Sequence, residues 1–535
     1  MKRIMVMLAF VAFGLTAGAQ DASVKNGIKL YNYKKYKSAQ AVLTPLAEKD
    51  PLANYYLGLL HIATGNLDQA AAAFARFPED LANISGTARV AFAKKDITTG
   101  NNIAKALAAK AKKKDFLPQK YAADAITYSE GGDYAQAVAW YKDVLVKNAG
   151  GDNADVHIGL ADAMRKTPGG GGEAMTNYEM VTEKDKTNSL AFTRIGDLWY
   201  EARNYQSALD NYARAKDADN TNPLPYKALA NAYSRSGKYK LALQNLEEYL
   251  AHSDNTNEDQ IEYVRAMYQA QSYCDAAKLA EKLIGSQTDQ ARITELTGIL
   301  GFSQVNCNDS MAALTNLRKY FMMQDPKKIL PGAYLEYGKL FLKLGMLDSA
   351  GAYYTKGIEG DTTKNKSEVY REVAEAFKGK KEYCNAAEWY DKLVKANPAT
   401  QPLDYFWRGY MFYYCNSMDK AMKSFEEFEA KYPDQPSAYY WHGRAAAAID
   451  SEATEGLATP HFTKWLEKVG PTYEKKNDMK IAYQYLVLYY YKKKDKENLK
   501  VYMDKLAAIA PEDALLKQIQ DADKPAPAKK PAGSK

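Results

Sequence analysis

The stretch SLAFTRIGDLWYEARNYQSALDNYARAKDADNTN, residues 189–222, contains two apolar stripes separated by a turn. In its first half, Ile195, Leu198 and Trp199 recur at intervals of three and four residues, the spacing of one helix face. Asn204 follows, a residue type that favours turns. The second half carries another stripe, formed by Ala208, Leu209, Tyr212 and Ala215. The stretch therefore predicts two helices, each with one apolar face.

The same pattern recurs along the chain with a period near 34 residues. A small residue marks the first helix of most units, as at Ala125, Gly196 and Gly409, and a second small residue follows twelve positions later. The unit around Gly298 is an exception, because its second small residue is Ser310 rather than alanine. One helix pair cannot bury its apolar face alone, so neighbouring pairs must stack. Such a period is typical of a solenoid, and the register predicts about fourteen units.

These residues resemble the tetratricopeptide repeat. In the unit at 189–222, the residues that match family positions 8, 11, 20, 24 and 27 are Gly196, Trp199, Ala208, Tyr212 and Ala215. The resemblance covers nearly the whole mature chain. It implies an all-α fold, a right-handed superhelical α-solenoid of helix-turn-helix repeats, in which the first helix of each pair lines a concave groove that binds partners.

The longest step of the series, 40 residues, separates Ser310 from Ala350 and contains two prolines. Because proline breaks helices, we expect a junction at 326–332 between one repeat stack at 20–325 and a second stack at 333–515. The Pro-, Ala- and Lys-rich C-terminal end predicts a disordered tail, placed at 516–535.

Residues 1–19 have the features of a secretory signal peptide. Two basic residues precede the apolar stretch 4–15, and the sequence AGA at 17–19 fits a cleavage site. Cleavage leaves Gln20, rather than a lipid-accepting cysteine, as the new N-terminus. We therefore expect export to the periplasm, and peripheral association with the outer membrane or the cell wall is a further expectation. A single N-terminal membrane anchor is the alternative interpretation.

The four cysteines fall into two pairs, each separated by about one repeat. Cys274 and Cys384 come just before the small residue of a second helix, and Cys307 and Cys415 lie near the turn of the following unit. An oxidising compartment permits bonding, so we predict the disulfides Cys274–Cys307 and Cys384–Cys415. Buried free thiols that fill the turns are the alternative.

The sequence has no motif typical of an enzyme or a metal site. It lacks HExxH, GxSxG and P-loop motifs and any CxxC pair, and its five histidines have no ligand spacing. We therefore predict no catalytic residues, no metal site and no cofactor. The net charge of +7 is small for 535 residues, and the basic runs at 110–114 and 492–496 are typical of solvated helix ends. We expect no nucleic acid partner.

Aromatic residues of the C-terminal units are the candidate binding residues. By the resemblance, they occupy positions of the first helices that face the groove, and Tyr and Arg are enriched where binding energy concentrates. The predicted groove residues are Phe406, Tyr410, Tyr413, Tyr440, Arg444, Tyr483 and Tyr490. The alternative is core packing, because a register slip of one residue would bury Tyr410 or Tyr440.

The sequence favours a non-catalytic periplasmic scaffold or adaptor, which binds a protein partner of the cell envelope in the concave groove. The alternative is a protein that binds envelope glycan or peptidoglycan on a helical-repeat scaffold, because stacked aromatics also suit a sugar face. An enzyme on such a scaffold would need a clustered acid–base pair, which the sequence does not display.

Overall fold

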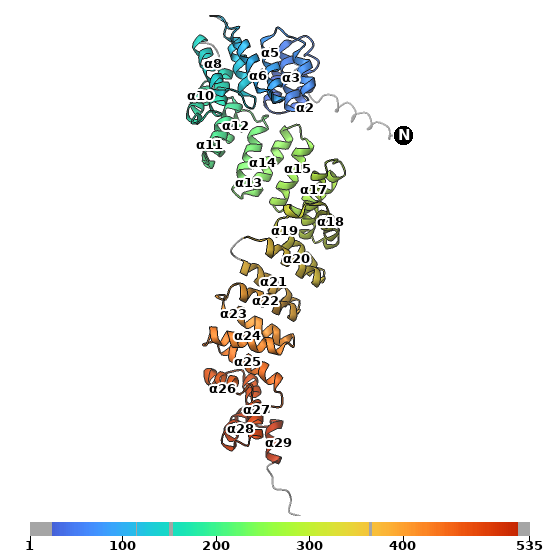
Figure 1. Cartoon of the computed structure of the whole chain (residues 1–535), viewed down its shortest axis with the longest axis vertical. Coiled ribbons are helices and arrows are strands. Elements are labelled where there is room, and N and C mark those ends of the chain that lie inside the picture. Colours follow the sequence, from blue (N-terminus) through green and yellow to red (C-terminus); the bar gives the residue numbers. More distant parts are fainter. Residues whose placement is uncertain (1–23, 114, 149–152, 363–365, 523–535) are drawn as a thin grey trace, which may run out of the picture. The chain divides into compact units, whose positions relative to one another are not determined.

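The computed structural model describes residues 24–113, 115–148, 153–362 and 366–522. Within these ranges the chain forms 29 α-helices and no strand, apart from one isolated bridge between Lys112 and Asp115 (Figure 1). Successive helices pack in pairs, and within each of the two compact units described below each pair packs on the next. The predicted all-α solenoid is confirmed. The predicted signal peptide at 1–19 lies outside the described residues.

The chain divides into two compact units between Met323 and Gln324. Unit 1 consists of nine helix pairs, α1 (Val24–Asn32), α2 (Tyr36–Leu43), α3 (Pro51–Ala63), α4 (Leu67–Phe74), α5 (Leu81–Ala93), α6 (Ile97–Ala108), α7 (Leu117–Thr127), α8 (Tyr134–Lys147), α9 (Ala154–Met164), α10 (Gly171–Lys184), α11 (Ser189–Glu201), α12 (Tyr205–Ala218), α13 (Leu224–Arg235), α14 (Tyr239–His252), α15 (Asn257–Gln269), α16 (Tyr273–Ile284), α17 (Gln290–Asn306) and α18 (Ser310–Met323).

Unit 2 consists of five pairs and a final helix. They are α19 (Pro331–Lys343), α20 (Leu347–Gly360), α21 (Lys366–Gly379), α22 (Tyr383–Ala396), α23 (Pro402–Tyr414), α24 (Met418–Lys431), α25 (Pro436–Ile449), α26 (Thr459–Val469), α27 (Lys476–Lys493), α28 (Lys496–Ile509) and α29 (Ala514–Ala522). The predicted junction at 326–332 falls at the start of unit 2, where Pro326–Lys328 forms a single 3₁₀ turn. None of the described helices combines the length and the apolar character that a membrane span requires.

A residue with positive φ lies in the turn inside each of the fourteen pairs, and the thirteenth pair has a second one, Gly456. In the sixth pair it is Arg203, with φ of 61°. The next N–H, that of Asn204, donates to the carbonyl of Trp199 at 2.9 Å, which is the Schellman arrangement that ends a helix. The other positions are Lys34, Gly65, Lys95, Gly131, Gly169, Gly237, Gln271, Asn308, Gly345, Lys381, Asn416, Ala453 and Lys494. This single backbone reversal sets the pairing of the two helices.

The register predicted for the ninth pair, α17 and α18, is wrong by three residues. Ala313, rather than Ser310, is the fully buried small residue of α18. Gly301, rather than Gly298, faces Leu317, the residue sixteen positions later, as in the other pairs. The glycines three residues apart lie on one face of the long helix α17, so the spacing alone could not distinguish them. The positive-φ residues of the eighth, ninth and tenth pairs are Gln271, Asn308 and Gly345, and each is 37 residues from the next. The repeat length is therefore 37 residues at both steps, whereas the small residues of the second helices suggested 34 and 40.

Close contact between helices depends on glycines that face aromatic rings. The Phe74 ring of α4 contacts both Gly58 of α3 and Gly86 of α5, and a Cβ atom at either glycine would lie 2.3 or 2.2 Å from its Cε1. We expect Gly86→Ala to destabilise unit 1 by about 1–3 kcal/mol, because one methyl group overpacks this contact. Urea unfolding followed by circular dichroism measures the change.

The matched control is Gly172→Ala, another glycine within a helix, because no atom lies within 4 Å of a Cβ there. Its expected effect is neutral or stabilising by up to about 1 kcal/mol, the difference in helix propensity. If the two substitutions change the free energy of unfolding equally, the contact with Phe74 is not the reason why position 86 requires glycine.

The four cysteines lie in two pairs at the same place in the repeat. Cys274 and Cys384 are the second residues of α16 and α22, and Cys307 and Cys415 follow the last residues of α17 and α23. The Cα atoms are 5.5 Å apart in the pair Cys274–Cys307 and 4.9 Å apart in the pair Cys384–Cys415, as disulfides require. Each disulfide joins the start of the second helix of one pair to the turn inside the next pair.

The tail predicted at 516–535 begins too early. Residues 514–522 form helix α29, in which Leu516 and Ile519 are buried against the core that includes Leu506 of α28. These apolar residues lie three apart on one helix face, which covers the end of the last pair. Residues 523–535 lie outside the described ranges.

Unit 1 curves until its first pair lies beside its sixth and seventh pairs. Lys29 of α1 forms an ion pair with Asp219, which follows α12, at 2.7 Å, and the hydroxyl of Tyr33 donates to the same carboxylate at 2.8 Å. Asp254, which follows α14, accepts from the hydroxyl of Ser38 at 2.6 Å. Burial opposes ionisation of Asp219, but hydrogen bonds from Lys29, Thr221 and Tyr33 lower its pKa to about 2. These contacts close one turn of the solenoid.

Candidate functional site

Aromatic rings gather on the first helices of the twelfth and thirteenth pairs, α23 and α25. The Tyr410 ring lies 4.6 Å from the Trp441 ring, centroid to centroid, and Tyr413 lies 5.3 Å from Trp441. Tyr410 also lies 4.6 Å from Tyr414 and 5.3 Å from Phe406. We call these five rings, together with the guanidinium of Arg444, the aromatic surface. Tyr414 is 46% exposed, and the other members are partly exposed.

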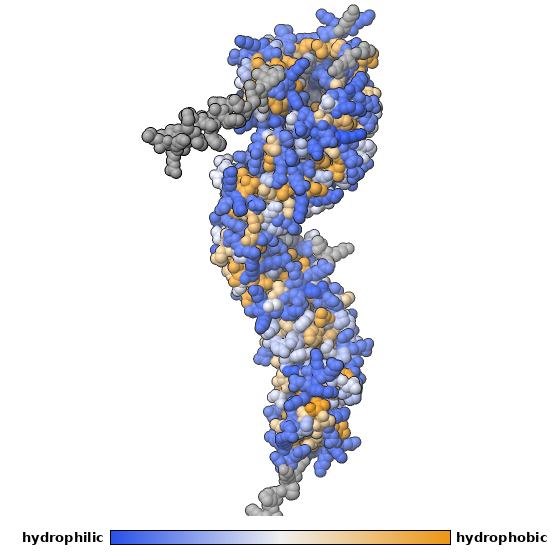
Figure 2. Space-filling view, turned by 180° about the vertical axis from the view of Figure 1, so that it is seen from behind, coloured by the Kyte–Doolittle hydropathy of each residue, from blue (hydrophilic) through white to orange (hydrophobic). Residues whose placement is uncertain are grey.

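The amphipathic pattern of α23 explains why these rings face outward. Tyr405, Gly409 and Phe412 form the buried face of α23, and Gly409 packs on the Phe425 ring of α24. The aromatic residues that remain lie on the other side of the helix, four residues apart or next to each other. On the face drawn in Figure 2, hydrophobic residues of both units lie mostly in small groups among hydrophilic ones.

Arg444 is held within the aromatic surface by hydroxyl groups. Its Nη1 donates to the hydroxyl of Tyr440 at 3.0 Å, and its Nη2 donates to the hydroxyl of Tyr413 at 3.1 Å. The guanidinium carbon lies 5.3 Å from the centroid of the Trp441 ring. Among the described residues, no carboxylate forms an ion pair with Arg444. Its charge is thus positioned and half-buried, and donors remain beyond the two in use.

Four of the seven predicted groove residues belong to the aromatic surface: Phe406, Tyr410, Tyr413 and Arg444. Tyr440 is only 5% exposed, packs on Trp465 with centroids 4.7 Å apart, and donates to Asp478 at 3.0 Å. Its hydroxyl positions Arg444, but its ring offers little area to a partner.

The other two predicted groove residues, Tyr483 and Tyr490, contact α28 instead. Tyr483 is 6% exposed, and the Tyr490 ring stacks on the Tyr502 ring with centroids 5.6 Å apart. Both rings therefore help to join α27 and α28 within one pair.

Trp441 is the residue that the sequence reasoning missed. It lies three positions before Arg444, so the two share a helix face, and Trp441 is partly exposed there whereas the ring of Tyr440 is buried. The buried residues Ala438, Ala445 and Ala446 mark the opposite side of α25. The run of small residues could have indicated this register.

A second candidate site is a cavity of about 300 Å³ inside the closed turn of unit 1. The first helices of six successive pairs contribute to its wall, because the turn brings them around one centre. The residues that represent them are Tyr31 (α1), Tyr56 (α3), Arg89 (α5), Lys120 (α7), Asp162 (α9) and Arg194 (α11). Charged and aromatic side chains thus line the same cavity.

Most charges of this cavity are paired with one another. Lys120 forms ion pairs with Asp124 at 3.0 Å and Asp155 at 3.2 Å, and Arg194 lies 3.4 Å from Asp162. The buried hydroxyl of Tyr141 donates to Asp124 at 2.6 Å. Burial, followed by the charge of Asp124, raises the pKa of Tyr141 well above its usual value, so the hydroxyl remains a donor. These pairs stabilise the wall and leave fewer groups for a ligand than the aromatic surface does.

Residues 29–82 match the tetratricopeptide repeat family. Among solved structures, the chain is similar to the C-terminal part of a repeat protein of this family from Cytophaga hutchinsonii, with 23% identity over 49% of this chain and 99% of that chain, and a TM-score of 0.32. A tetratricopeptide repeat protein from Parabacteroides merdae shares 17% identity over 50% of this chain and 96% of that one, with a TM-score of 0.30.

PilF from Pseudomonas aeruginosa shares 18% identity over 41% of this chain and 95% of its own, with a TM-score of 0.30. No curated protein matches the sequence. The family match covers the first two helix pairs, and the same pairing, with its positive-φ turn, continues through all fourteen pairs. The described chain is thus an α-solenoid of helix pairs, of which residues 29–82 match the tetratricopeptide repeat family.

Proposed function

We propose that this protein is a non-catalytic adaptor of the cell envelope, which binds a segment of a protein partner at the aromatic surface of unit 2. Repeat scaffolds of this family generally serve protein–protein interaction. The observation that carries the proposal is a group of five partly exposed rings, of which Tyr413 and Trp441 contact an arginine that has no carboxylate partner among the described residues. Tyrosine, tryptophan and arginine are the residue types that dominate binding energy at interfaces.

The chemistry of the aromatic surface indicates the kind of segment that it binds. The rings of Tyr410, Tyr414 and Trp441 offer area to an apolar or aromatic side chain. Arg444 offers its charge and its free donors to a carboxylate or to backbone carbonyls. A segment with an acidic residue next to an apolar one, extended or helical, would satisfy both.

The proposed compartment rests on the N-terminal sequence and on the cysteines. The first nineteen residues have the pattern of a secretory signal. Two disulfides are consistent with an oxidising compartment such as the periplasm. Fractionation of cells that produce the full chain tests this placement, and recovery of the protein in the cytoplasm with its first residues intact would exclude it.

Partner binding is tested by a photo-reactive residue at Tyr414, the most exposed ring of the aromatic surface. We expect cross-linking in cells to yield a discrete protein adduct. Trp441→Ala and Arg444→Ala should each weaken binding of the purified partner by about 30-fold or more, because hot-spot residues contribute at least about 2 kcal/mol. Isothermal titration gives the affinities.

The matched control is Tyr239→Ala in α14 of unit 1, where the tyrosine is 41% exposed and lies outside the aromatic surface. The affinity of this variant for the purified partner should equal that of the unsubstituted protein. Equal loss in all three variants, or unchanged affinity in the Trp441 and Arg444 variants, would refute the assignment of this surface. If the photo-reactive residue at position 414 is cross-linked to polysaccharide alone, the result would favour glycan binding instead.

A further inference from the structure

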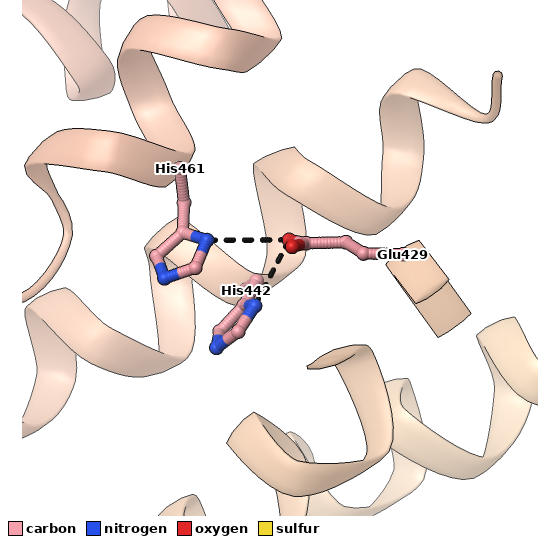
Figure 3. Close-up of side chains that lie close together, drawn as sticks. All are labelled: Glu429, His442 and His461. Carbon is pink, nitrogen blue, oxygen red and sulfur yellow. Dashed lines mark hydrogen bonds and ion pairs between the residues drawn. The ribbon is translucent and has the colours of Figure 1, made fainter. Parts of the chain in front are cut away.

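Three side chains able to bind a metal ion meet on successive helices of unit 2: Glu429 of α24, His442 of α25 and His461 of α26 (Figure 3). The Nδ1 atom of His442 lies 2.9 Å from Oε1 of Glu429, and the Nδ1 atom of His461 lies 3.2 Å from the same oxygen. The candidate ligand atoms all lie within 4.8 Å of one another. The sequence predicts no such cluster, because the three residues are far apart along the chain.

The connection between α25 and α26 brings His461 to this place. Asp450 accepts the backbone N–H of Thr454 at 2.8 Å and that of Gly456 at 2.7 Å, and the hydroxyl of Tyr485 at 2.7 Å. These hydrogen bonds hold the connection, so that α26 begins at Thr459 with His461 in its first turn. The imidazoles of His442 and His461 then stack, with centroids 3.5 Å apart. The cluster is therefore preorganised by the backbone around it.

The cluster is sheltered but open on one side. The exposed fractions of the side chains are 6% for His442, 16% for Glu429 and 20% for His461. They line a surface recess together with Glu426 and Lys423 of α24. Glu426 precedes Glu429 by three residues, is exposed, and makes no hydrogen bond or ion pair with another described residue. A carboxylate is thus available at the open side, although Lys423 brings a positive charge to the rim.

Two imidazole nitrogens and one carboxylate oxygen form a ligand set that suits Zn²⁺. A tetrahedral zinc ion with bonds of about 2.0–2.1 Å has ligand atoms about 3.3 Å apart. The separations of 2.9 and 3.2 Å approach this value, so a small outward movement of the side chains admits the ion. Binding at Nδ1 requires that each neutral imidazole carry its proton on Nε2.

We propose that Glu429, His442 and His461 form a Zn²⁺ site that ties α24, α25 and α26 together, with a fourth position for Glu426 or water. The proposal concerns a site apart from the aromatic surface and does not depend on partner binding there. In a solenoid, where each repeat contacts only its neighbours, such a tie would stabilise this region locally.

The test uses the full chain, purified without a histidine tag or reductant and dialysed against a chelator. Calorimetric titration with Zn²⁺ should show one ion per chain, and His461→Gln should weaken this binding by about 100-fold or more, because it removes a ligand. His252→Gln is the matched control, since His252 also lies beside a glutamate, Glu248, at 3.8 Å, but outside the cluster. We expect binding to this control to be unchanged.

A second readout separates loss of the site from loss of the fold. Co²⁺ bound to the unsubstituted protein should give the strong visible absorption of a four-coordinate ion, which hexa-aqua Co²⁺ lacks. His461→Gln should lose this absorption while it keeps the helical circular dichroism of the unsubstituted protein. Absence of stoichiometric Zn²⁺ binding, or equal binding by the His461 and His252 variants, would show that the three residues form a hydrogen-bonded cluster only.

Discussion

Asp162→Ala is expected to destabilise unit 1 by about 1–3 kcal/mol, because it leaves the buried hydroxyl of Tyr178 without its acceptor. The carboxylate of Asp162 accepts from the fully buried hydroxyl of Tyr178 at 2.5 Å and from that of Tyr128 at 3.0 Å. It also lies 3.4 Å from Nε of Arg194, across the cavity wall. Urea unfolding measures the total change, and hydrogen exchange of α9 to α11 locates it, because repeats of a solenoid respond locally.

Asp155→Ala is the control for this prediction. Asp155 lies in the same helix and lines the same cavity, but its side chain is 67% exposed and its ion pair with Lys120 spans 3.2 Å. Exposed ion pairs contribute at most about 1 kcal/mol, so this variant should remain close to the unsubstituted protein. If both variants lose equal stability, or neither does, Asp162 is not the centre of the hydrogen-bonded wall.

Replacement of Cys384 and Cys415 by serine is expected to destabilise unit 2 by about 3–4 kcal/mol. The disulfide closes a loop of 31 residues, and the entropy of such a loop in the unfolded chain sets this magnitude. Cys384 is exposed, so serine creates no cavity in the core at that position. The loss therefore measures the cross-link rather than packing, and thermal unfolding of the double variant gives its size.

Thiol titration of the denatured, unreduced protein provides the control for the disulfides. Neither pair should react before reduction, and four thiols per chain should appear after it. Reaction of four thiols without reductant would show that the cysteines are free, and the serine variant should then be as stable as the unsubstituted protein. After reduction, the unsubstituted protein should be less stable than the double variant, because it has also lost the Cys274–Cys307 cross-link.

The solenoid could be predicted from the sequence because each pair is specified by residues close together in the chain. Gly196 and Tyr212 lie sixteen residues apart and touch within one pair, so their spacing repeats wherever the pair repeats. The cysteine pairs follow the same rule, because neighbouring repeats place equivalent turns side by side. The rule failed at α17, where Gly298 and Gly301 both fit the spacing and only the contact with Leu317 distinguishes them.

The candidate binding residues could be predicted only in part, because exposure depends on a helix register that one residue changes. Phe406 and Tyr410 are partly exposed, whereas the ring of Tyr440 is buried and that of Trp441 is partly exposed beside Arg444. Aromatic residues serve both the core and the surface of a repeat, so their identity does not reveal which face they occupy.

The sequence by itself determined the repeat, the helix pairing and the cysteine spacing, because these depend on local periodicity and on contacts between adjacent pairs. Only the tertiary structure decided which distant residues meet. Lys29 reaches Asp219 because the curvature of many pairs accumulates to one full turn, which no single repeat encodes. Glu429, His442 and His461 converge because three helix directions and one hydrogen-bonded connection bring them together, and their separations in the chain carry no sign of it.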